Sequence, residues 1–488
     1  MTGEQLALTS IAELAPLVRG REVSPVEIVE ATLTRIQRLG PTLNCYLTVC
    51  SEQAREQAVR LERRLAAGEW LGPLHGISVS LKDNIETAGV LTTAGSPILR
   101  QWIPKRDATS IALLRSHGAV LVGKCNLYEF AYGAPNPTYG PTRNPWNLEH
   151  SCGGSSSGSA AAVAAGLCHA SLGTDTGGSI RIPSAFCGVV GLKPTYGRVS
   201  RAGVIPVSYN LDHVGPITRT VHDAALVLAA LSGPDPRDPT AARRQSDDFT
   251  SELEEGVAGL RLGVCAARQL EGAEAEARDA FERACAILEG KGATLREVEL
   301  PDLDEARTLM WAISAAEAAD YHRSWLREHG EAYHPVVRSL LEVGEFLPAV
   351  DYVRAQRVRR RVCEELGQLL DGLDALLIPA VPVSAYRIGQ RALTVADVEE
   401  DVLRVITRFT PLFNLTGNPA LVLPCAFSVA GLPLGLQIVG RPFAEARVFR
   451  IARAFERAGG WQRMPPDPPL LDMQEYSTAT ESTRSPGP

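Results

Sequence analysis

Two glycine-rich loops that carry serine are the most unusual features of this sequence. The first is Cys152-Gly-Gly-Ser-Ser-Ser-Gly-Ser159, and the second is Gly173-Thr-Asp-Thr-Gly-Gly-Ser-Ile-Arg181. Gly177 and Gly178 allow the backbone to turn sharply and to approach a ligand without hindrance from a Cβ atom. Because successive N–H groups in such a turn form a concave anion site, this loop predicts stabilisation of the oxyanion of an acyl-transfer reaction at Ser179.

A serine becomes a nucleophile only when a base accepts its proton. No histidine lies next to either loop in a recognisable catalytic pattern, and Lys82 is the alternative base. Residues 77–82 alternate between apolar side chains and Ser78, Ser80 and Lys82, which predicts a strand with one apolar and one polar face. A lysine accepts a proton only when it is neutral, so burial must lower its pKa from the reference value of about 10.4.

On the residues alone, other interpretations of these loops stay open. Phosphate cradles and plain turns have similar sequences, although the absence of Gly-Lys-Ser/Thr after the first glycine pair disfavours a P-loop. Cys152 and Cys187 are further candidate nucleophiles, but neither has an evident base. Ser156 and Ser159 are candidates too, and we favour local hydrogen bonds at a helix start for both.

Composition and charge disfavour several classes of function. The formal net charge of −7 and the lack of a basic stripe disfavour nucleic-acid binding. The basic run 357–361 lies in a helical pattern and is interpreted as a solvated helix face. The ten cysteines show no zinc-binding spacing and are typical of buried thiols in a reducing cytoplasm. The N-terminus resembles no signal peptide, and no apolar run is long enough to span a membrane.

The elements that must position these residues follow from periodicity. A helix should begin at Ser24, where Ser-Pro-Val-Glu forms a capping box, and a second should cover residues 51–66. Residues 107–118 are expected to form a helix and residues 119–123 a buried strand. Because strands alternate with helices, we predict an α/β sheet. Length alone would favour two or three domains.

Three long segments resemble the amidase signature family. They are Gly153–Gly166, Gly173–Pro183 and Gly188–Arg198. Shorter matching pieces are Val79–Asn84, Gly123–Phe130, Asn144-Pro-Trp146 and Leu434–Gly440. The resemblance covers roughly residues 5–462 and is densest from 76 to 217.

The resemblance implies a Ser–cis-Ser–Lys triad. Carried over to this sequence, Ser179 is the nucleophile, Ser155 is the bridging serine after a cis peptide bond, and Lys82 is the base. The backbone N–H groups implied for the oxyanion hole are those of Thr176, Gly177, Gly178 and Ser179.

Further roles follow less directly. Tyr128, Gly154 and Tyr132 are expected to bind substrate. A wider aromatic pocket would also include Phe130 and Tyr139. Asp175 and Arg181 are expected to brace the loops.

Asp212 and His213 could complete a Ser-His-Asp triad. The family has a similar Leu-Asp-His-Val-Gly-Pro segment without that role, which disfavours this interpretation.

The family also implies one large α/β domain, which replaces the expectation from length. We predict a single amidase-signature domain over residues 1–464, with a mixed β-sheet core flanked by helices on both faces. Its catalytic core is about 76–217, and residues 465–488 are predicted to form a disordered tail.

The function predicted from this resemblance is a cytoplasmic amidase that needs no cofactor or metal. Its expected substrate is a small-molecule amide or carbamate, with neither nucleic acid nor a membrane as partner, and a homodimer is left open.

A first rival is the glutaminase subunit of the tRNA-dependent amidotransferase, which belongs to the same family but works in a complex. That subunit's Arg-Tyr-Asp-Gly-type segment is not found, and Thr407 stands at its glutamine-binding Asp, so we expect a stand-alone enzyme. A second rival is an inactive binding scaffold, which the intact triad disfavours.

Overall fold

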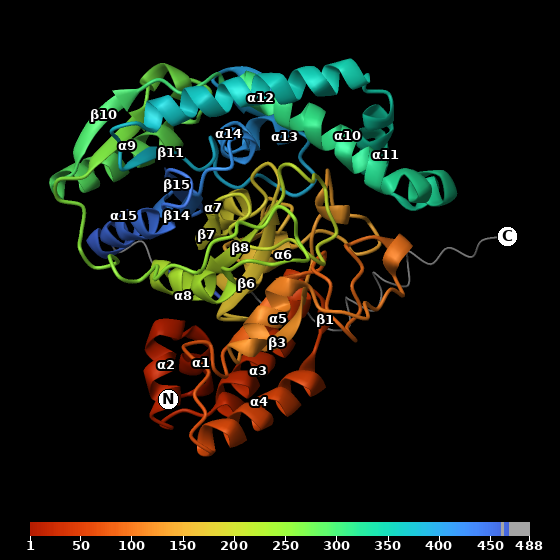
Figure 1. The fold of residues 1–488 in the computed structure, drawn as a ribbon, viewed down its shortest axis with the longest axis vertical. Coiled ribbons are helices and arrows are strands. Elements are labelled where there is room, and N and C mark those ends of the chain that lie inside the picture. The colour runs from red at the N-terminus through yellow and green to blue at the C-terminus, as the bar shows by residue number, and fades with distance from the viewer. Residues whose placement is uncertain (460–462, 468–488) are drawn as a thin grey trace.

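The computed structural model describes residues 1–459 and 463–467. Figure 1 shows a central sheet that crosses the molecule, with helices on both of its faces. Within the described ranges, no helix is long and apolar enough to cross a membrane. The predicted tail falls largely on residues 468–488, which lie outside the described residues.

The central sheet is mixed and has eleven strands within the described chain. Strands β2, β3 and β6 are parallel to one another, and β9, β10 and β11 form a second parallel group; antiparallel pairs join the two groups. In spatial order the strands are β1 (Tyr46–Val49), β3 (Val120–Cys125), β2 (Ser78–Lys82), β6 (Ala170–Asp175), β8 (His213–Thr218), β7 (Val190–Lys193), β14 (Ala420–Phe427), β15 (Pro433–Val439), β11 (Ala375–Pro379), β9 (Arg261–Cys265) and β10 (Thr294–Val298). Two small hairpins lie outside it, β4 (Arg143–Asn144) with β5 (Asn147–Ser151) and β12 (Ala392–Val395) with β13 (Val398–Asp401).

Helices cover both faces of this sheet, as predicted. One face carries α3 (Pro25–Leu43), α4 (Ser51–Ala66), α6 (Ser157–Ala164) and α7 (Arg181–Cys187). The other carries α5 (Thr109–Ser116), α8 (Val221–Leu231), α9 (Ala275–Gly290) and α15 (Glu445–Ala458). Successive side chains of β3 point to opposite faces of the sheet. Val120 and Val122 pack in the core of the first face, and Leu121 packs in the core of the second. The predicted single α/β domain is therefore confirmed.

The local predictions of secondary structure largely agree with the structure. Helix α3 begins after Ser24, whose side chain accepts from the N–H groups of Val26 and Glu27 in the predicted capping box. Helix α4 covers residues 51–66 as expected. The polar face of β2 does not face solvent. Ser78 and Ser80 are fully buried and hydrogen-bonded within the protein.

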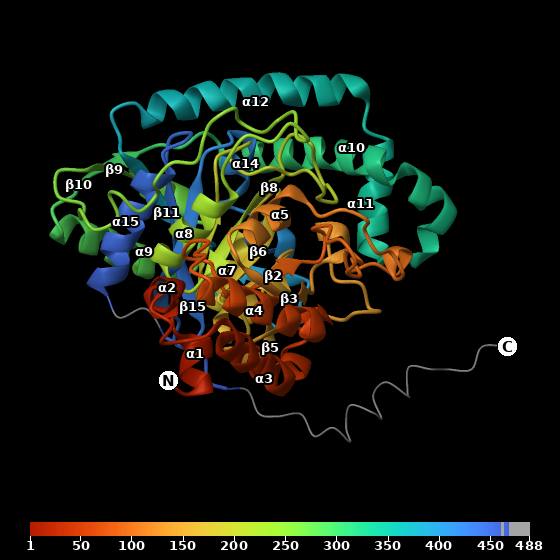
Figure 2. The same ribbon diagram turned by 60° about the horizontal axis from the view of Figure 1, so that its bottom comes forward.

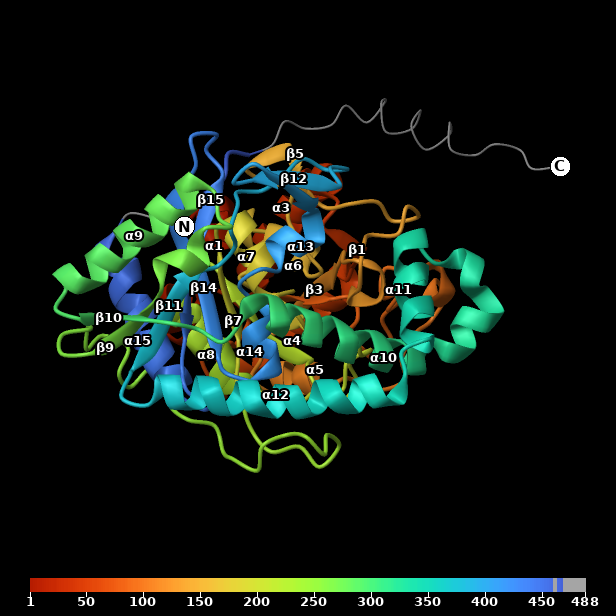
Figure 3. The same cartoon turned by 90° about the horizontal axis from the view of Figure 1, so that it is seen from above.

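A third group of helices lies beyond the sheet and follows β10 in sequence. It comprises α10 (Leu303–His329), α11 (Pro335–Glu345), α12 (Ala349–Leu370), α13 (Val402–Ile406) and α14 (Pro411–Leu415). Two short helices, α1 (Gly3–Leu8) and α2 (Ile11–Arg19), lie at the opposite end of the molecule (Figure 1). Helix α12 runs along the edge of the molecule in Figure 2, and in Figure 3 a yellow-green loop extends beyond it.

Helix α10 is tied to both α12 and a loop that leads toward β8. Its Glu317 carboxylate accepts hydrogen bonds from Tyr352 of α12, at 2.7 Å, and from Ser208 and Asn210 of the loop. These bonds fix the position of α10 relative to the sheet.

Close packing of α10 against α11 generates a prediction about stability. A Cβ atom at Gly344 would lie 2.1 Å from the carbonyl oxygen of Ala315. Gly344→Ala must push the two helices apart, and we expect it to lower the free energy of unfolding by about 1–3 kcal/mol. Gly367→Ala is the matched control, because Gly367 of α12 has open space around it, and alanine there should raise stability by up to about 1 kcal/mol. Urea denaturation of both variants measures the difference, and equal effects would contradict the packing argument.

Candidate active site

The structure brings Lys82, Ser155 and Ser179 to one place. Lys82 ends β2, Ser155 precedes the first turn of α6, and Ser179 precedes α7. The N–H of Ser156 donates to the carbonyl oxygen of Ser179 at 3.2 Å, which joins the two glycine-rich loops directly. The peptide bond between Gly154 and Ser155 is cis, as the family resemblance implies.

The Lys82 side chain is completely buried behind Ser155. Its Nζ donates to the Ser155 Oγ at 2.7 Å, to the Thr174 Oγ1 at 2.8 Å and to the Thr174 carbonyl at 3.3 Å. Burial lowers the pKa of Lys82 to about 7, against the opposing attraction of Asp175 and Asp212. A substantial fraction of this amine is therefore neutral near pH 7, which is the state that can accept a proton.

A buried ion pair holds the loop that carries Ser179. The Arg181 Nε and Nη2 each lie 3.0 Å from an oxygen of Asp175, and both side chains are fully buried. Burial acts to raise the pKa of Asp175, but the Arg181 charge and hydrogen bonds outweigh it and hold that pKa well below its usual range. Asn414 Nδ2 donates to the same carboxylate at 2.8 Å, so Asp175 stays ionised in a dry environment.

The turn before Ser179 uses its glycines as predicted. Gly178 has φ of 132°, a conformation that favours glycine, and a Cβ atom there would lie 2.4 Å from the Thr410 hydroxyl. The Gly178 N–H donates to Asp175 at 2.8 Å. Among the hydrogen bonds of the described residues, none uses the N–H of Gly177 or Ser179. The N–H of Thr176 is likewise without a partner among the described residues, so of the four predicted donors only that of Gly178 is occupied within the protein.

Ser155 and Ser179 line one narrow cavity of about 60 Å³. Its walls are mostly apolar and include no Asp, Glu, Lys or Arg. The lining residues are Tyr128, Ala131, Tyr132, Gly133, Gly154, Ser155, Thr176, Gly177, Ser179, Ile182, Val207, Met310, Trp311, Ser314, Leu403, Ile406 and Thr407.

A larger cavity of about 640 Å³ shares Tyr128, Gly133 and Leu403 with the narrow one. Two charged residues, Arg391 and Asp401, line this larger cavity. The Tyr128 ring lies against Gly154, where a Cβ atom would come within 2.4 Å of it. Tyr128 therefore forms the wall between the narrow cavity and the wider one.

The predicted aromatic pocket is only partly present. Tyr128 and Tyr132 line the narrow cavity together with Gly154. Phe130 instead packs among His322, Trp325 and Tyr333, away from this cavity.

Tyr139 belongs to neither cavity lining, and its hydroxyl donates to the carbonyl of Ser96 at 3.4 Å. Phe130 and Tyr139 are thus packing residues in this structure.

The alternative nucleophile systems are not assembled around Ser179. The ring nitrogens of His213 face the carbonyls of Asp175 and Leu211 and the amine of Lys193. Asp212 instead accepts from the Thr176 hydroxyl at 2.5 Å. No Ser-His-Asp arrangement forms with these residues.

The remaining nucleophile candidates have structural contacts instead. Burial raises the pKa of the Cys152 thiol, and Cys187 is also buried. Ser156 and Ser159 donate to the carbonyls of Thr174 and Leu172, each at 3.2 Å. These bonds attach α6 to β6, which agrees with the local hydrogen bonds expected for both serines.

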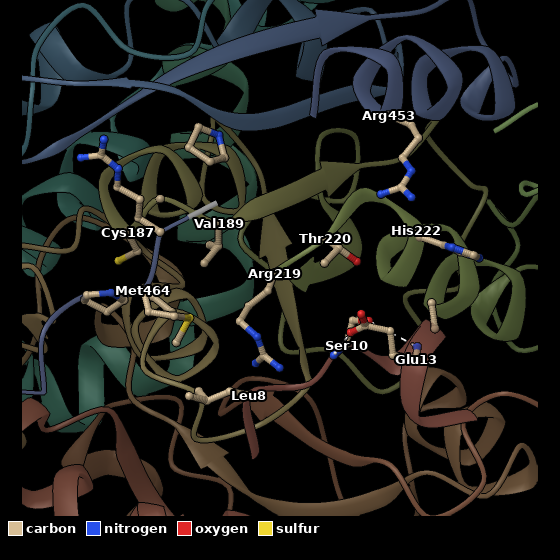
Figure 4. A pocket seen from close by; sticks show the side chains of 16 residues that line it. Leu8, Ser10, Glu13, Cys187, Val189, Arg219, Thr220, His222, Arg453 and Met464 are labelled. Carbon is tan, nitrogen blue, oxygen red and sulfur yellow. Dashed lines mark hydrogen bonds between the residues drawn. The ribbon is translucent and has the colours of Figure 1, made fainter. Parts of the chain in front are cut away.

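A separate pocket of about 490 Å³ lies at the far ends of α6 and α7 (Figure 4). Ala164 and Cys187, the last residues of those helices, line it together with Arg219, His222 and Arg453. None of the candidate catalytic residues lines this pocket. Within the described ranges, no group of three or more His, Cys, Asp and Glu side chains is placed to hold a metal ion.

Several residues of the site give no local signal in the sequence. Met310, Trp311 and Ser314 come from α10, more than a hundred residues after the glycine-rich loops. Leu403 and Ile406 come from α13. The sequence of α10 has almost no one-sided apolar pattern, so no local signal indicates the cavity that this helix faces.

A model of the family described as Amidase matches residues 27–449. The chain therefore belongs to the amidase signature family, whose enzymes act on carbon–nitrogen bonds. Over 480 residues it is 41% identical to a Glutamyl-tRNA(Gln) amidotransferase subunit from Geobacter sp. (strain M21), covering 93% of this chain and 97% of the relative.

Two solved structures also match nearly the whole chain. The corresponding Glutamyl-tRNA(Gln) amidotransferase subunit from Thermotoga maritima is 37% identical, with a TM-score of 0.80, and 95% of this chain and 98% of that one are covered. A structure described as an unexpected vestigial protein complex that reveals the evolutionary origins of an s-triazine catabolic enzyme is 34% identical, with a TM-score of 0.89; coverage is 92% and 99%.

The prediction of a stand-alone amidase, rather than the amidotransferase subunit, is wrong. Its two grounds, the missing Arg-Tyr-Asp-Gly-type segment and Thr407, concern few positions, whereas the likeness to the Geobacter subunit extends over 93% of this chain. The exclusion of nucleic acid and the restriction to a small-molecule substrate are contradicted by the same relatives. The surface charge of one subunit reports only its own contacts, so a missing basic stripe does not exclude a role in a tRNA-dependent complex.

The buried Asp175–Arg181 pair generates a prediction. Asp175→Asn keeps the shape of the side chain but leaves the Arg181 guanidinium buried without a counter-charge, so we expect a loss of about 3–5 kcal/mol in the free energy of unfolding. The exposed pair of Glu149 and Arg387 is the control, because Glu149→Gln should cost less than about 1 kcal/mol. Chemical denaturation compares them, and a loss below about 1 kcal/mol for Asp175→Asn would show that the pair does not hold the loop.

Proposed function

We propose that this chain is the amide-hydrolysing subunit of a tRNA-dependent amidotransferase of the glutamyl-tRNA(Gln) type. The observation that carries the hydrolytic part is the Lys82 amine, buried, with a pKa of about 7 and 2.7 Å from the Ser155 hydroxyl. The part played in a complex is supported by relatives that are named as a subunit of that amidotransferase and are 38–42% identical over nearly the whole chain.

In the proposed reaction Ser179 attacks the carbonyl carbon of a carboxamide. Ser155 accepts the Ser179 proton and passes its own to neutral Lys82, and the proton then returns through Ser155 to the leaving amine. The N–H groups of Gly177 and Ser179 stabilise the oxyanion, aided by the start of α7. Water then hydrolyses the acyl-enzyme by the reverse proton transfers.

The amide donor in an amidotransferase of this type would be glutamine, and the two cavities bear on how it binds. The narrow cavity has no ionised side chain for an α-ammonium or α-carboxylate group, and burying either there would be costly. The wider cavity offers Arg391 and Asp401, whose charges are opposite to those two groups. We therefore assign the carboxamide to the narrow cavity and the charged groups to the wider one.

The apolar lining also favours a second candidate, a carboxamide whose acyl group is uncharged. Ile182, Met310 and Trp311 would contact such a group without any charged partner. The two candidates share the Ser179 chemistry and differ in the amide that they hydrolyse.

The first functional prediction separates these amides. Ammonia release is measured from glutamine and from pentanamide, an uncharged primary amide of similar length, with and without Arg391→Ala. If glutamine is the donor, the exposed Arg391 contributes to binding, and its loss should raise KM for glutamine by about tenfold while leaving pentanamide unchanged. An enzyme that hydrolyses only pentanamide, with no effect of Arg391→Ala, would establish the second candidate.

The second prediction concerns the nucleophile. Ser179→Ala should lower turnover by roughly 10⁴-fold or more, with an unchanged melting temperature, because no other group can form the ester. Ser184→Ala is the control and should keep activity within about tenfold, because it removes a buried hydroxyl of α7 that has no hydrogen-bond partner among the described residues and lines neither cavity. A covalent serine reagent should label Ser179, and labelling of Ser155 or Cys187 instead would contradict the assignment.

The third prediction concerns the protonation of Lys82. Because burial lowers its pKa to about 7, kcat/KM should rise about tenfold per pH unit below that value and level off above it, where the amine is neutral. Lys82→Arg keeps a charge that cannot be removed and should be inactive across about pH 6–10. A Lys82→Arg variant within about tenfold of wild type, roughly 1.4 kcal/mol of barrier, would rule out the role as base.

A further inference from the structure

Thr174 contacts the amine of Lys82 with two of its atoms. Its hydroxyl Oγ1 lies 2.8 Å and its carbonyl oxygen 3.3 Å from the Lys82 Nζ. The two residues meet because β2 and β6 are parallel neighbours, with Leu81 opposite Leu172. Thr174 is buried, and neither the triad nor the predicted oxyanion hole includes it.

The number of acceptors around Lys82 equals the number of N–H groups on its charged form. A lysine ammonium carries three N–H donors, and the Nζ lies within hydrogen-bond distance of three oxygens, two of Thr174 and the Oγ of Ser155. The neutral amine has only two N–H groups and one lone pair. When the oxygens of Thr174 accept both N–H groups, the lone pair is left facing the Ser155 hydroxyl, which is the proton donor in the proposed reaction.

Two further bonds hold the oxygens of Thr174 in place. The Asn84 Nδ2 donates to the Thr174 Oγ1 at 3.2 Å, and the Ser156 hydroxyl donates to the Thr174 carbonyl at 3.2 Å. Asn84 lies two residues after Lys82, and Ser156 directly follows Ser155. Thr174 therefore joins the segment of the base to the loop of the bridging serine.

We propose that Thr174 is a positioning residue for the base: it accepts both N–H groups of neutral Lys82 and thereby directs the lone pair at Ser155. The inference rests on the proposed role of Lys82 as the base and goes beyond it, because it names the residue that sets the direction of proton transfer. The Thr174 carbonyl belongs to the backbone and remains in any variant, so the hydroxyl is the part that substitution can remove.

Loss of that hydroxyl should also change the pH at which the base titrates. A hydrogen bond that the ammonium donates favours the charged form, so we expect the Thr174 hydroxyl to raise the pKa of Lys82 against the effect of burial. Among the described residues, the charged groups that act on Lys82 are Asp175, at the end of β6, and Asp212, just before β8, and both raise the same pKa. A substitution at Thr174 leaves both of these charges in place.

Thr174→Val and Thr174→Ser separate positioning from packing, because valine keeps the branched shape without a hydroxyl and serine keeps the hydroxyl. The readout is the rate at which phenylmethanesulfonyl fluoride modifies Ser179 from about pH 5 to about pH 9. This reaction needs the same proton transfer, whichever amide the enzyme hydrolyses. Thr174→Val should lower the plateau rate at least about tenfold and move the midpoint down by about 0.5–1 pH unit. Thr174→Ser should keep the midpoint and a rate within about threefold of wild type.

Thr218→Val is the matched control. Thr218 is buried on β8 opposite Ala170, at the far end of β6 from Thr174, and its hydroxyl donates to the Thr220 carbonyl at 2.8 Å. The same substitution there should leave the midpoint unchanged and the rate within about threefold of wild type. If Thr174→Val fails to fold, Thr174→Ala compared with Thr174→Ser isolates the hydroxyl in the same way.

The outcomes distinguish a failure of this proposal from a failure of the proposed chemistry. If Lys82→Arg stays active, Lys82 is not the base and both proposals fail. If Lys82→Arg is inactive but Thr174→Val keeps the wild-type midpoint and rate, only the role of Thr174 is overturned. A Thr174→Val variant that changes the rate alone or the midpoint alone, or a Thr174→Ser variant as slow as Thr174→Val, would likewise overturn the positioning role and leave Lys82 as the base.

Discussion

The buried ion pair of Asp175 and Arg181 is the interaction on which the geometry of the site depends. The Asp175 carboxylate accepts from the N–H of Gly178, and Arg181 reaches Thr410, Asn414 and Gln437. The Arg181 side chain therefore joins the loop of Ser179 to β15 and to α14, which lie far along the chain. A buried charge pair with so many hydrogen bonds restricts the arrangements open to the loop, and the turn of Gly177, Gly178 and Ser179 belongs to that loop.

The same dry interior has the opposite effect on Lys82. Asp175 is kept charged by a close counter-ion, whereas the nearest partners of Lys82 are the neutral oxygens of Ser155 and Thr174. Burial then favours the uncharged amine and lowers its pKa. Two ionisable groups in neighbouring positions of the sheet are thus tuned in opposite senses by whether a counter-charge is adjacent.

The parts of the fold that carry local signals could be predicted from the sequence. The capping box at Ser24, the alternation that ends at Lys82 and the glycines around Ser179 each reflect short-range stereochemistry. The walls of the narrow cavity could not be predicted, because Met310 and Leu403 reach it only through the tertiary packing of α10 and α13. The family resemblance implied the cis bond, which the structure contains, and the triad. The stand-alone prediction was wrong because it gave Thr407 more weight than a likeness that extends over 93% of the chain.

The origin of the cavity walls has a consequence for how such a protein can diversify. The two serine loops and β2 come from one stretch of the chain, whereas α10 and α13, which follow much later, supply five of the residues that line the narrow cavity. Substitutions within those two helices can therefore alter which amide is accepted while the bond-breaking apparatus is inherited unchanged. The wall of the cavity and the two serine loops are thus separate units of the chain, and a change in one need not alter the other.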